Sequence, residues 1–236
     1  MKPKPKNFVN VAKKALLFDL DGTLIDSLDD LVSAINRTME QNGFAPLSRD
    51  AVSRFIGKGS RILVEKALRS VLGQTPPKEI TDSIHRQYLT NMLLTQGRYT
   101  RCFDGVHESL TQFQNLGFSL ALVTNKPRAN TLQLLKQLEL EKFFPVVVAG
   151  DDTPHPKPAP DILFSAMRQL GVESKDCIMI GDSMNDAQAA LEAGSPCFLL
   201  QTGYNEGINI ADWAKIHAPE SLVFANIKDI VSYLSQ

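Results

Sequence analysis

The sequence predicts an α/β fold in which a doubly wound parallel sheet carries a small helical domain inserted after its first strand. Two observations predict it. Short, continuous apolar runs alternate with longer segments of helical periodicity, which is the rhythm of β–α–β units. In addition, about 100 residues without a convincing strand separate the first apolar run from the second, far more than one crossover helix needs.

Five apolar runs are the expected strands of the sheet. Each is bounded by Gly, Pro, Asp or Asn, and runs of this length are typical of strands that are buried on both faces. They cover residues 15–18, 118–123, 146–149, 177–180 and 197–200. Two of the helices between them are defined by their ends: a stripe of Phe164, Met167 and Leu170 stops at Gly171, and a helix over 185–193 stops at Gly194.

The long interval after the first strand has helical periodicity. Its apolar residues fall into three stripes, punctuated by glycines and by a Pro-Pro pair. The stripes are Leu28, Leu31, Val32, Ile35 and Met39; Ile62, Leu63, Ala67, Leu68, Val71 and Leu72; and Ile80, Ile84, Tyr88 and Met92. We therefore assign residues 1–26 and 101–236 to the α/β core and residues 27–100 to a helical domain.

Composition excludes several classes of protein. With 43% hydrophobic and 22% charged residues the chain is typical of globular proteins, and its net charge of −1 provides no positive field for nucleic acid or anionic lipid. Three scattered cysteines indicate neither a disulfide framework nor a zinc site. No apolar run is long enough for a membrane helix, and we expect the basic residues 2–6 to be a solvated tail of a cytoplasmic protein rather than a signal peptide.

Two carboxylates follow the first strand. Asp19 and Asp21 are two residues apart, so they project to the same side of an extended chain, and Gly22 then allows a sharp turn. Ligands of open α/β sheets bind beyond the carboxyl ends of the strands, and oxygen ligands without Cys or His favour Mg²⁺. The alternative is an Asp-rich turn in which Asp21 only caps a helix.

Polar residues also follow the next strands. Thr124 and Asn125 end the second expected strand, where they could hold an anion or simply cap the following helix. Lys157 stands between Pro156 and Pro158, which restrict the backbone and suit a lysine that meets a phosphate or a carboxylate. The alternative for Lys157 is a solvated side chain beside a helix that begins at Pro158.

A third carboxylate, Asp182, closes the strand over 177–180. Ser183 and Asp186 follow with the spacing of a capping box, so Asp186 either starts the next helix or supports a metal site from behind its ligands. In a parallel sheet, Asp182 and the polar clusters described above converge at one edge.

These motifs, in this order, resemble those of the haloacid-dehalogenase-like hydrolase superfamily. The matching pieces are Asp19-Leu20-Asp21-Gly22-Thr23, Thr124, Lys157 and Gly181-Asp182-Ser183-Met184-Asn185-Asp186. The segment Thr202-Gly203-Tyr204 further resembles the phosphoglycolate phosphatase subgroup. The resemblance covers essentially the whole chain after the first residues, and it implies a Rossmann-like core with a helical cap domain.

The resemblance also implies a division of labour. Asp19 is expected to attack phosphorus and become a phosphoaspartate, while Asp21 protonates the leaving alkoxide and then deprotonates water. Mg²⁺ is expected to be held by Asp19, by the backbone carbonyl of Asp21 and by Asp182. The presence of Asp21 argues against dehalogenation, because a departing halide needs no proton donor.

The substrate is expected to be held by residues from the core and from the cap. Thr124 and the backbone amide of Asn125 would bind phosphate oxygens, and Lys157 would neutralise charge on the phosphoryl group and on Asp19. Lys58 resembles a residue of the cap loop that faces the active site, where it would bind a small carboxylate; the alternative is an exposed lysine in an interhelical turn.

The sequence therefore predicts a Mg²⁺-dependent phosphatase acting on a small phosphorylated metabolite, with 2-phosphoglycolate as the expected substrate and no nucleic-acid or membrane partner. The chain is expected to be a monomer or a homodimer. The alternatives are a phosphotransferase like β-phosphoglucomutase, a pyrophosphatase, and a sugar or nucleotide phosphatase of the same superfamily. A non-enzymatic phospho-receiver is disfavoured, because such modules are shorter and lack both the helical insert and an acid at the position of Asp21.

Overall fold

The computed structural model describes residues 14–236, so the basic residues 2–6 lie outside the described part of the chain. Its centre is a six-stranded sheet with the order β5-β4-β1-β6-β7-β8, in which every neighbouring pair is parallel. The strands are β1 (Ala15–Phe18), β4 (Ser119–Val123), β5 (Val146–Val148), β6 (Cys177–Gly181), β7 (Cys197–Leu200) and β8 (Leu222–Phe224). The predicted fold class is confirmed.

All five predicted strands are present, and their bounds agree with the prediction within one residue. The strand β8 was not predicted. It is three residues long, lies at the edge of the sheet and is only partly buried, so it lacks the continuous apolar run that marks the central strands.

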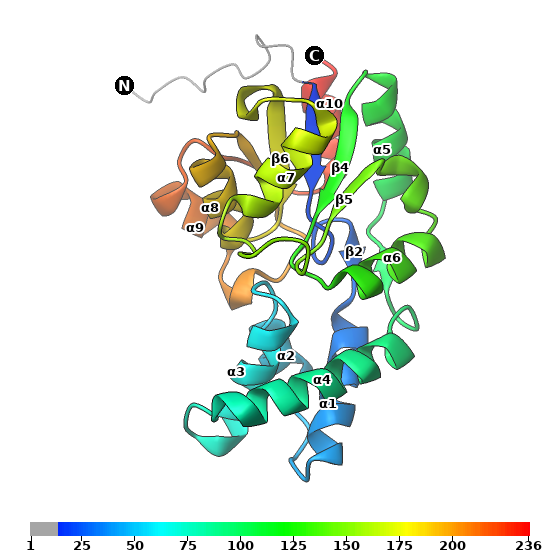
Figure 1. The fold of residues 1–236 in the computed structure, drawn as a ribbon. Helices are drawn as coiled ribbons and strands as arrows, with labels where there is room; N and C mark the ends of the chain where they lie inside the picture. Colours follow the sequence, from blue (N-terminus) through cyan, green and yellow to red (C-terminus); the bar gives the residue numbers. More distant parts are fainter. Residues whose placement is uncertain (1–13) are drawn as a thin grey trace.

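Helices cover both faces of the sheet, and alternate residues of each strand pack against them (Figure 1). Leu16 and Phe18 of β1 face one layer, whereas Ala15 and Leu17 face the other. The first layer is formed by α5 (Val106–Asn115), α6 (Arg128–Gln137) and α10 (Ile227–Leu234). The second layer is formed by α7 (Asp161–Leu170), α8 (Met184–Ala193) and α9 (Ile210–His217).

The predicted ends of α7 and α8 are confirmed, since Gly171 and Gly194 cap them in the left-handed conformation. The predicted apolar stripe of α7 is wrong in one member. Phe164 is 43% exposed, and the helix instead buries a face that is centred between Ile162 and Met167.

The segment between β1 and β4 folds into a second group of helices with its own apolar core. These are α1 (Leu28–Gln41), α2 (Arg49–Ser53), α3 (Ser60–Leu72) and α4 (Lys78–Thr95). Figure 1 shows them beyond the carboxyl ends of the strands. Most stripe residues are buried, but Val71, Leu72 and Ile80 lie near helix ends and are exposed, contrary to the stripe prediction. No helix within residues 14–236 is long and apolar enough to cross a bilayer.

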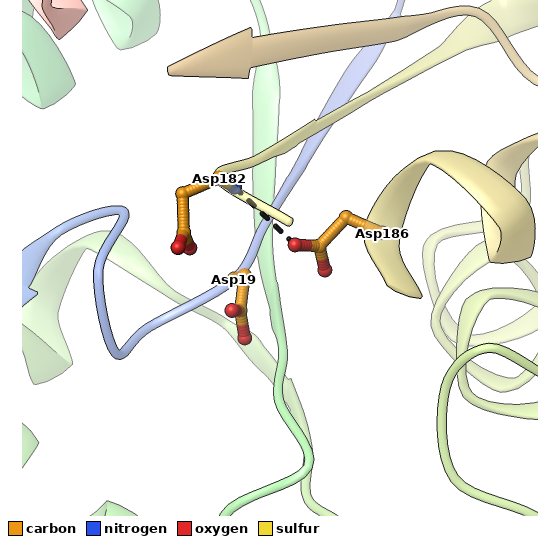
Figure 2. A group of neighbouring side chains, drawn as sticks. All are labelled: Asp19, Asp182 and Asp186. Atoms are coloured by element: carbon orange, nitrogen blue, oxygen red, sulfur yellow. Dashed lines mark hydrogen bonds between the residues drawn. The ribbon is translucent and has the colours of Figure 1, made fainter. Parts of the chain in front are cut away.

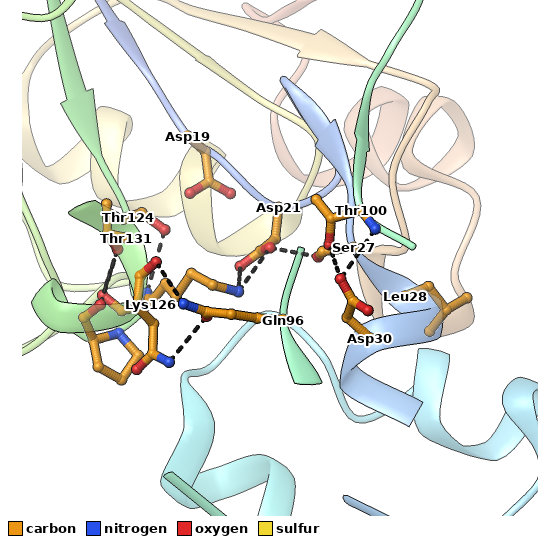
Figure 3. A network of polar contacts seen from close by, with 12 residues as sticks. Asp19, Asp21, Ser27, Leu28, Asp30, Gln96, Thr100, Thr124, Lys126 and Thr131 are labelled. Carbon is orange, nitrogen blue, oxygen red and sulfur yellow. Dashed lines mark hydrogen bonds and ion pairs between the residues drawn. The ribbon is translucent and has the colours of Figure 1, made fainter. Parts of the chain in front are cut away.

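Two short strands connect the helical group to the sheet domain. β2 (Ile25–Asp26) pairs antiparallel with β3 (Arg101–Cys102), so the chain leaves and returns side by side. Asp30 on α1 is buried and holds the returning segment, because its carboxylate accepts hydrogen bonds from the backbone N–H groups of Gly97, Tyr99 and Thr100 at 2.6 to 3.0 Å. Figure 3 shows the contact with Thr100. These hydrogen bonds fix the helical group close to the sheet edge.

Candidate active site

The polar clusters that follow the strands meet at the carboxyl edge of the sheet. Asp19 follows β1, Thr124 follows β4, Lys157 lies in the loop after β5, and Asp182 follows β6. A cavity of about 50 Å³ lies there, between the sheet and the helical group. Its walls include Asp19, Asp21, Thr124, Asn125, Lys126 and Lys157 from the core, and Leu31, Ile56, Leu63, Tyr88 and Met92 from the helical group.

Three carboxylates form a cluster on one side of this cavity. Asp19, Asp182 and Asp186 each offer an oxygen, and these oxygens lie within 4.8 Å of one another (Figure 2). Burial raises the pKa of Asp19 to about 6, in spite of the neighbouring Lys157 ammonium, and the charge of Asp186 adds to the rise. Burial, with the charges of Asp186 and Asp19, also holds the pKa of Asp182 well above its usual range. The cluster is therefore a place where a cation would be favoured.

The turn after Asp21 is built around Asp182. Gly22 has φ +89°, and a Cβ at this position would come within 2.5 Å of an Asp182 oxygen, so only glycine fits. The Thr23 hydroxyl donates to Asp182 Oδ1 at 2.8 Å, and the backbone N–H of Tyr204 donates to Oδ2 at 3.1 Å. Asp182 is thus held with each oxygen engaged once, which leaves a lone pair on each for a metal.

Lys157 is the cation of the cluster. Its side chain is buried, and its ammonium lies 2.9 Å from Asp19 Oδ1 and 2.6 Å from Asp186 Oδ1. The carboxylates of Asp186 and Asp19 outweigh the opposing effect of burial and raise the pKa of Lys157. The Asn125 amide fixes the loop, because its oxygen accepts from the Lys157 backbone N–H and its nitrogen donates to the Lys157 carbonyl, both at 2.8 Å. The solvated alternative for Lys157 is wrong.

Asp186 has three partners. Its Oδ2 accepts from the backbone N–H groups of Asp182 and Ser183, at 3.3 and 3.0 Å, and from the Ser183 hydroxyl at 2.7 Å, where α8 begins. Its Oδ1 pairs with Lys157. The predicted capping role is confirmed, and the support of a metal site stays a prediction.

Thr124 is buried against the cavity, and its hydroxyl accepts from the backbone N–H of Lys126 at 3.2 Å. The helix α6 begins only at Arg128 after Pro127, so neither Thr124 nor Asn125 caps it, and that alternative is wrong. The Asn125 side chain also donates to the backbone carbonyl of Gly57 at 3.0 Å. It thus joins the core to the loop between α2 and α3.

Asp21 turns away from the acidic cluster. Its carboxylate pairs with the buried ammonium of Lys126, at 3.0 Å from each oxygen, and accepts from the Ser27 hydroxyl at 2.5 Å (Figure 3). Sequence reasoning gave Lys126 no role, although it directly follows Thr124 and Asn125 in the same strand-end motif.

Lys58 is the one predicted binding residue that does not line the cavity with Asp19. Its side chain is 42% exposed, and its ammonium pairs with Glu206 Oε1 at 3.3 Å; Lys66 of α3 pairs with the other oxygen of Glu206. Binding of a substrate carboxylate by Lys58 stays a prediction.

Sequence reasoning gave no functional role to Tyr88, a residue of α4 in the helical group. It is fully buried and lines the cavity, yet its hydroxyl has no hydrogen-bond partner within the described residues. The Asn185 side chain, next to Asp186, is likewise buried without a partner in the described chain. The helical periodicity marked Tyr88 as a core residue, which it is, but gave no sign that its hydroxyl lies at the cavity.

Comparison with known proteins shows the family of this chain. A family model of the haloacid dehalogenase-like hydrolases matches residues 16–200. A phosphoglycolate phosphatase of Nitrosospira multiformis is 40% identical over 197 residues, covering 84% of this chain and 87% of the relative. Phosphoglycolate phosphatase 1 of Pseudomonas aeruginosa is 33% identical, covering 97% and 82%. The crystal structure of a predicted phosphoglycolate phosphatase from Haemophilus somnus superposes with a TM-score of 0.87 at 28% identity, covering 96% and 100%.

Proposed function

This chain belongs to the haloacid dehalogenase-like hydrolase family and is a phosphoric monoester hydrolase, and we propose that it hydrolyses 2-phosphoglycolate with Mg²⁺ through a phosphoaspartate on Asp19. The observation that carries the proposal is the position of Asp19. Its carboxylate lies at the cavity, between the buried ammonium of Lys157 and the carboxylate of Asp182. Relatives with 33–40% identity that are named phosphoglycolate phosphatases support the choice of substrate.

The residues present fit Mg²⁺. The cluster offers carboxylate oxygens only, and three buried or half-buried acids face one ammonium, so a divalent cation would balance their charge. Asp19 and Asp182 would hold the ion together with the backbone carbonyl of Asp21, because Oδ2 of Asp186 already accepts three hydrogen bonds and its Oδ1 pairs with Lys157. When bound, Mg²⁺ supplies charge neutralisation for the phosphoryl group.

The chain's own residues would divide the reaction into two displacements. In the first, an Asp19 oxygen bonds to phosphorus, the ester P–O bond breaks, and Asp21 gives a proton to the departing alkoxide. In the second, water gives its proton to Asp21 and attacks phosphorus, which releases phosphate and restores Asp19. Lys157, Thr124 and the backbone N–H of Asn125 would hold the phosphate oxygens throughout.

The size of the cavity supports a small leaving group. The cavity of about 50 Å³ is lined by Asp19, Thr124 and Lys157 as well as by the helical group, so it must take the phosphoryl group and the leaving group together. This favours a small ester over a hexose phosphate or a nucleotide. We propose that helices α1–α4 act as a cap that opens for the substrate and closes over it. Cytoplasmic localisation and a monomeric or dimeric state stay predictions.

The test is phosphate release from 2-phosphoglycolate, β-glucose 1-phosphate, a nucleoside monophosphate and pyrophosphate, each with and without Mg²⁺. We expect Mg²⁺-dependent release that favours 2-phosphoglycolate. Asp19→Asn should abolish it, because an amide cannot become a phosphoaspartate, while Asp212→Asn, an exposed control on α9, should match the wild type. Full activity of Asp19→Asn, or a preference for another ester, would contradict the proposal.

A further inference from the structure

We infer that the Tyr88 hydroxyl, together with the Lys126 ammonium, recognises the carboxylate of the leaving group and so determines the specificity of the cavity. This inference rests on the proposed function and deepens it. Its starting point is the hydroxyl of Tyr88, which is completely buried and has no hydrogen-bond partner within the described residues, although Tyr88 lines the same cavity as the acid Asp21. A buried hydroxyl without a partner is costly, so its partner is expected to be a bound molecule.

The two lysines of the cavity wall pair with different acids, which defines two ends of the site. Lys157 is paired with Asp19 and Asp186 and belongs to the end at which the phosphoryl group would bind. Lys126 is also buried, pairs with both oxygens of Asp21 and defines the other end. Because Asp21 would protonate the leaving oxygen, the atoms beyond that oxygen lie near Lys126. A second cation at this end is not needed for a neutral leaving group, but it suits an anionic one.

Tyr88 completes this end from the helical group. The other helical-group side chains in the cavity wall are Leu31, Ile56, Leu63 and Met92, which are apolar, and Ser60, whose hydroxyl pairs with His85. Tyr88 and Asp21 line the same cavity; burial raises the pKa of Tyr88, and the charge of Asp21 adds to the rise. The Tyr88 hydroxyl therefore keeps its proton, in a wall that is largely apolar. A short group with one methylene and one carboxylate would match the wall, the hydroxyl and the ammonium.

The substitution Tyr88→Phe tests this inference, because it removes the hydroxyl and keeps the ring. Two esters are compared: 2-phosphoglycolate, and ethyl phosphate, which has no carboxylate. We expect kcat/KM for 2-phosphoglycolate to fall about 10- to 100-fold, as for the loss of a hydrogen bond to a charged group, and kcat/KM for ethyl phosphate to change less than twofold. Tyr233→Phe on α10, a tyrosine that does not line the cavity, is the matched control. It should affect neither ester.

A second measurement separates this inference from the proposed function. Glycolate should inhibit the hydrolysis of ethyl phosphate, and Tyr88→Phe should weaken that inhibition about tenfold. If glycolate inhibition depends on Tyr88 but 2-phosphoglycolate is a poor substrate, the proposed function fails and the inference stands. If 2-phosphoglycolate is preferred but Tyr88→Phe changes neither its turnover nor glycolate inhibition, the inference is overturned.

A purely structural role gives a different result. A hydroxyl that supports the fold would lower the melting temperature when removed, and it would weaken both esters to the same extent. We expect Tyr88→Phe to melt at the wild-type temperature or above, because its hydroxyl has no partner within the described chain. Equal losses on both esters with a lowered melting temperature would overturn the inference.

Discussion

The ammonium of Lys126 lies 3.0 Å from both carboxylate oxygens of Asp21, although the two residues are 105 positions apart in the chain. The pair is largely shielded from solvent, with side-chain exposures of 4% for Lys126 and 15% for Asp21. An anion brought into the cavity beside Asp21 would meet repulsion if Lys126 were absent. The lysine therefore has two tasks, to orient Asp21 and to offset the charge of the leaving group.

Lys126→Met should separate these tasks. We expect kcat/KM for 2-phosphoglycolate to fall about 10- to 100-fold, since a buried charged pair is broken. The loss for ethyl phosphate should be smaller, but it should not vanish, because Asp21 loses its orienting partner in both cases. Steady-state kinetics on the two esters measures the difference. Lys136→Met, an exposed lysine in the last turn of α6, is the control; a silent Lys126→Met would refute the assignment.

Mg²⁺ should stabilise the protein through the acidic cluster. Asp19, Asp182 and Asp186 repel one another with only Lys157 between them, so the metal-free protein carries an electrostatic cost. At a concentration 100 times its Kd, Mg²⁺ should add about 2.7 kcal/mol to the free energy of unfolding. Asp182→Asn should remove this response and leave the metal-free melting temperature unchanged or raised. Thermal unfolding with and without Mg²⁺ measures it, and an undiminished response in Asp182→Asn would contradict the metal assignment.

The central strands could be predicted because burial on both faces requires an almost entirely apolar sequence. A strand such as Cys177–Gly181 is buried on both faces, so nearly every residue must be apolar, and the sequence shows it directly. The edge strand Leu222–Phe224 lacks this constraint, and the exposed Phe164 on α7 shows that one apolar residue at the right spacing does not define a buried face. The spacing of apolar residues predicts a buried face only where most residues of that face are in fact buried.

Some residues of the candidate site could be predicted from the sequence, and others could not. Asp19 and Asp182 directly follow strands and Lys157 lies in the loop after β5, so their convergence follows from the topology of a parallel sheet. The roles of Lys126 and Tyr88 depend on partners, or on missing partners, that are distant in sequence. The Lys126–Asp21 pair forms because β1 and β4 are neighbours in the sheet, and Tyr88 reaches the cavity because the helical group lies against the sheet edge. No local sequence pattern encodes either relationship.

The helical group should lose stability in mild acid because of His85. Burial, with the charge of Arg61 and a smaller contribution from Arg86, lowers the pKa of His85 below its usual 6.5, in spite of Asp82. A lowered pKa means that protonation favours the unfolded chain. The stabilising contribution is therefore complete above about pH 6.5 and is lost as the pH falls through the lower folded-state value.

His85→Gln tests this expectation, because glutamine cannot be protonated yet can still bond to the Ser60 hydroxyl, which lies 2.8 Å from His85 Nε2. Between pH 7.5 and pH 5.5 the melting temperature of the wild type should fall more than that of His85→Gln. His217→Gln, an exposed histidine at the end of α9, should keep the wild-type slope. Identical slopes for the wild type and His85→Gln would rule out His85 as the titrating group.

Lys58 and Lys126 are the two candidates for binding the substrate carboxylate, and their surroundings favour Lys126. Lys58 is 42% exposed and is already paired with Glu206, and exposed ion pairs contribute less than about 1 kcal/mol. We therefore expect Lys58→Ala to change kcat/KM for 2-phosphoglycolate less than about fivefold. Lys66→Ala, which removes the other partner of Glu206, should have a similar effect. Since both changes loosen the same contact between helical group and core, any shared loss should extend equally to ethyl phosphate. A tenfold loss confined to 2-phosphoglycolate and to Lys58→Ala would instead mean that this lysine leaves Glu206 and enters the cavity when the cap closes over substrate.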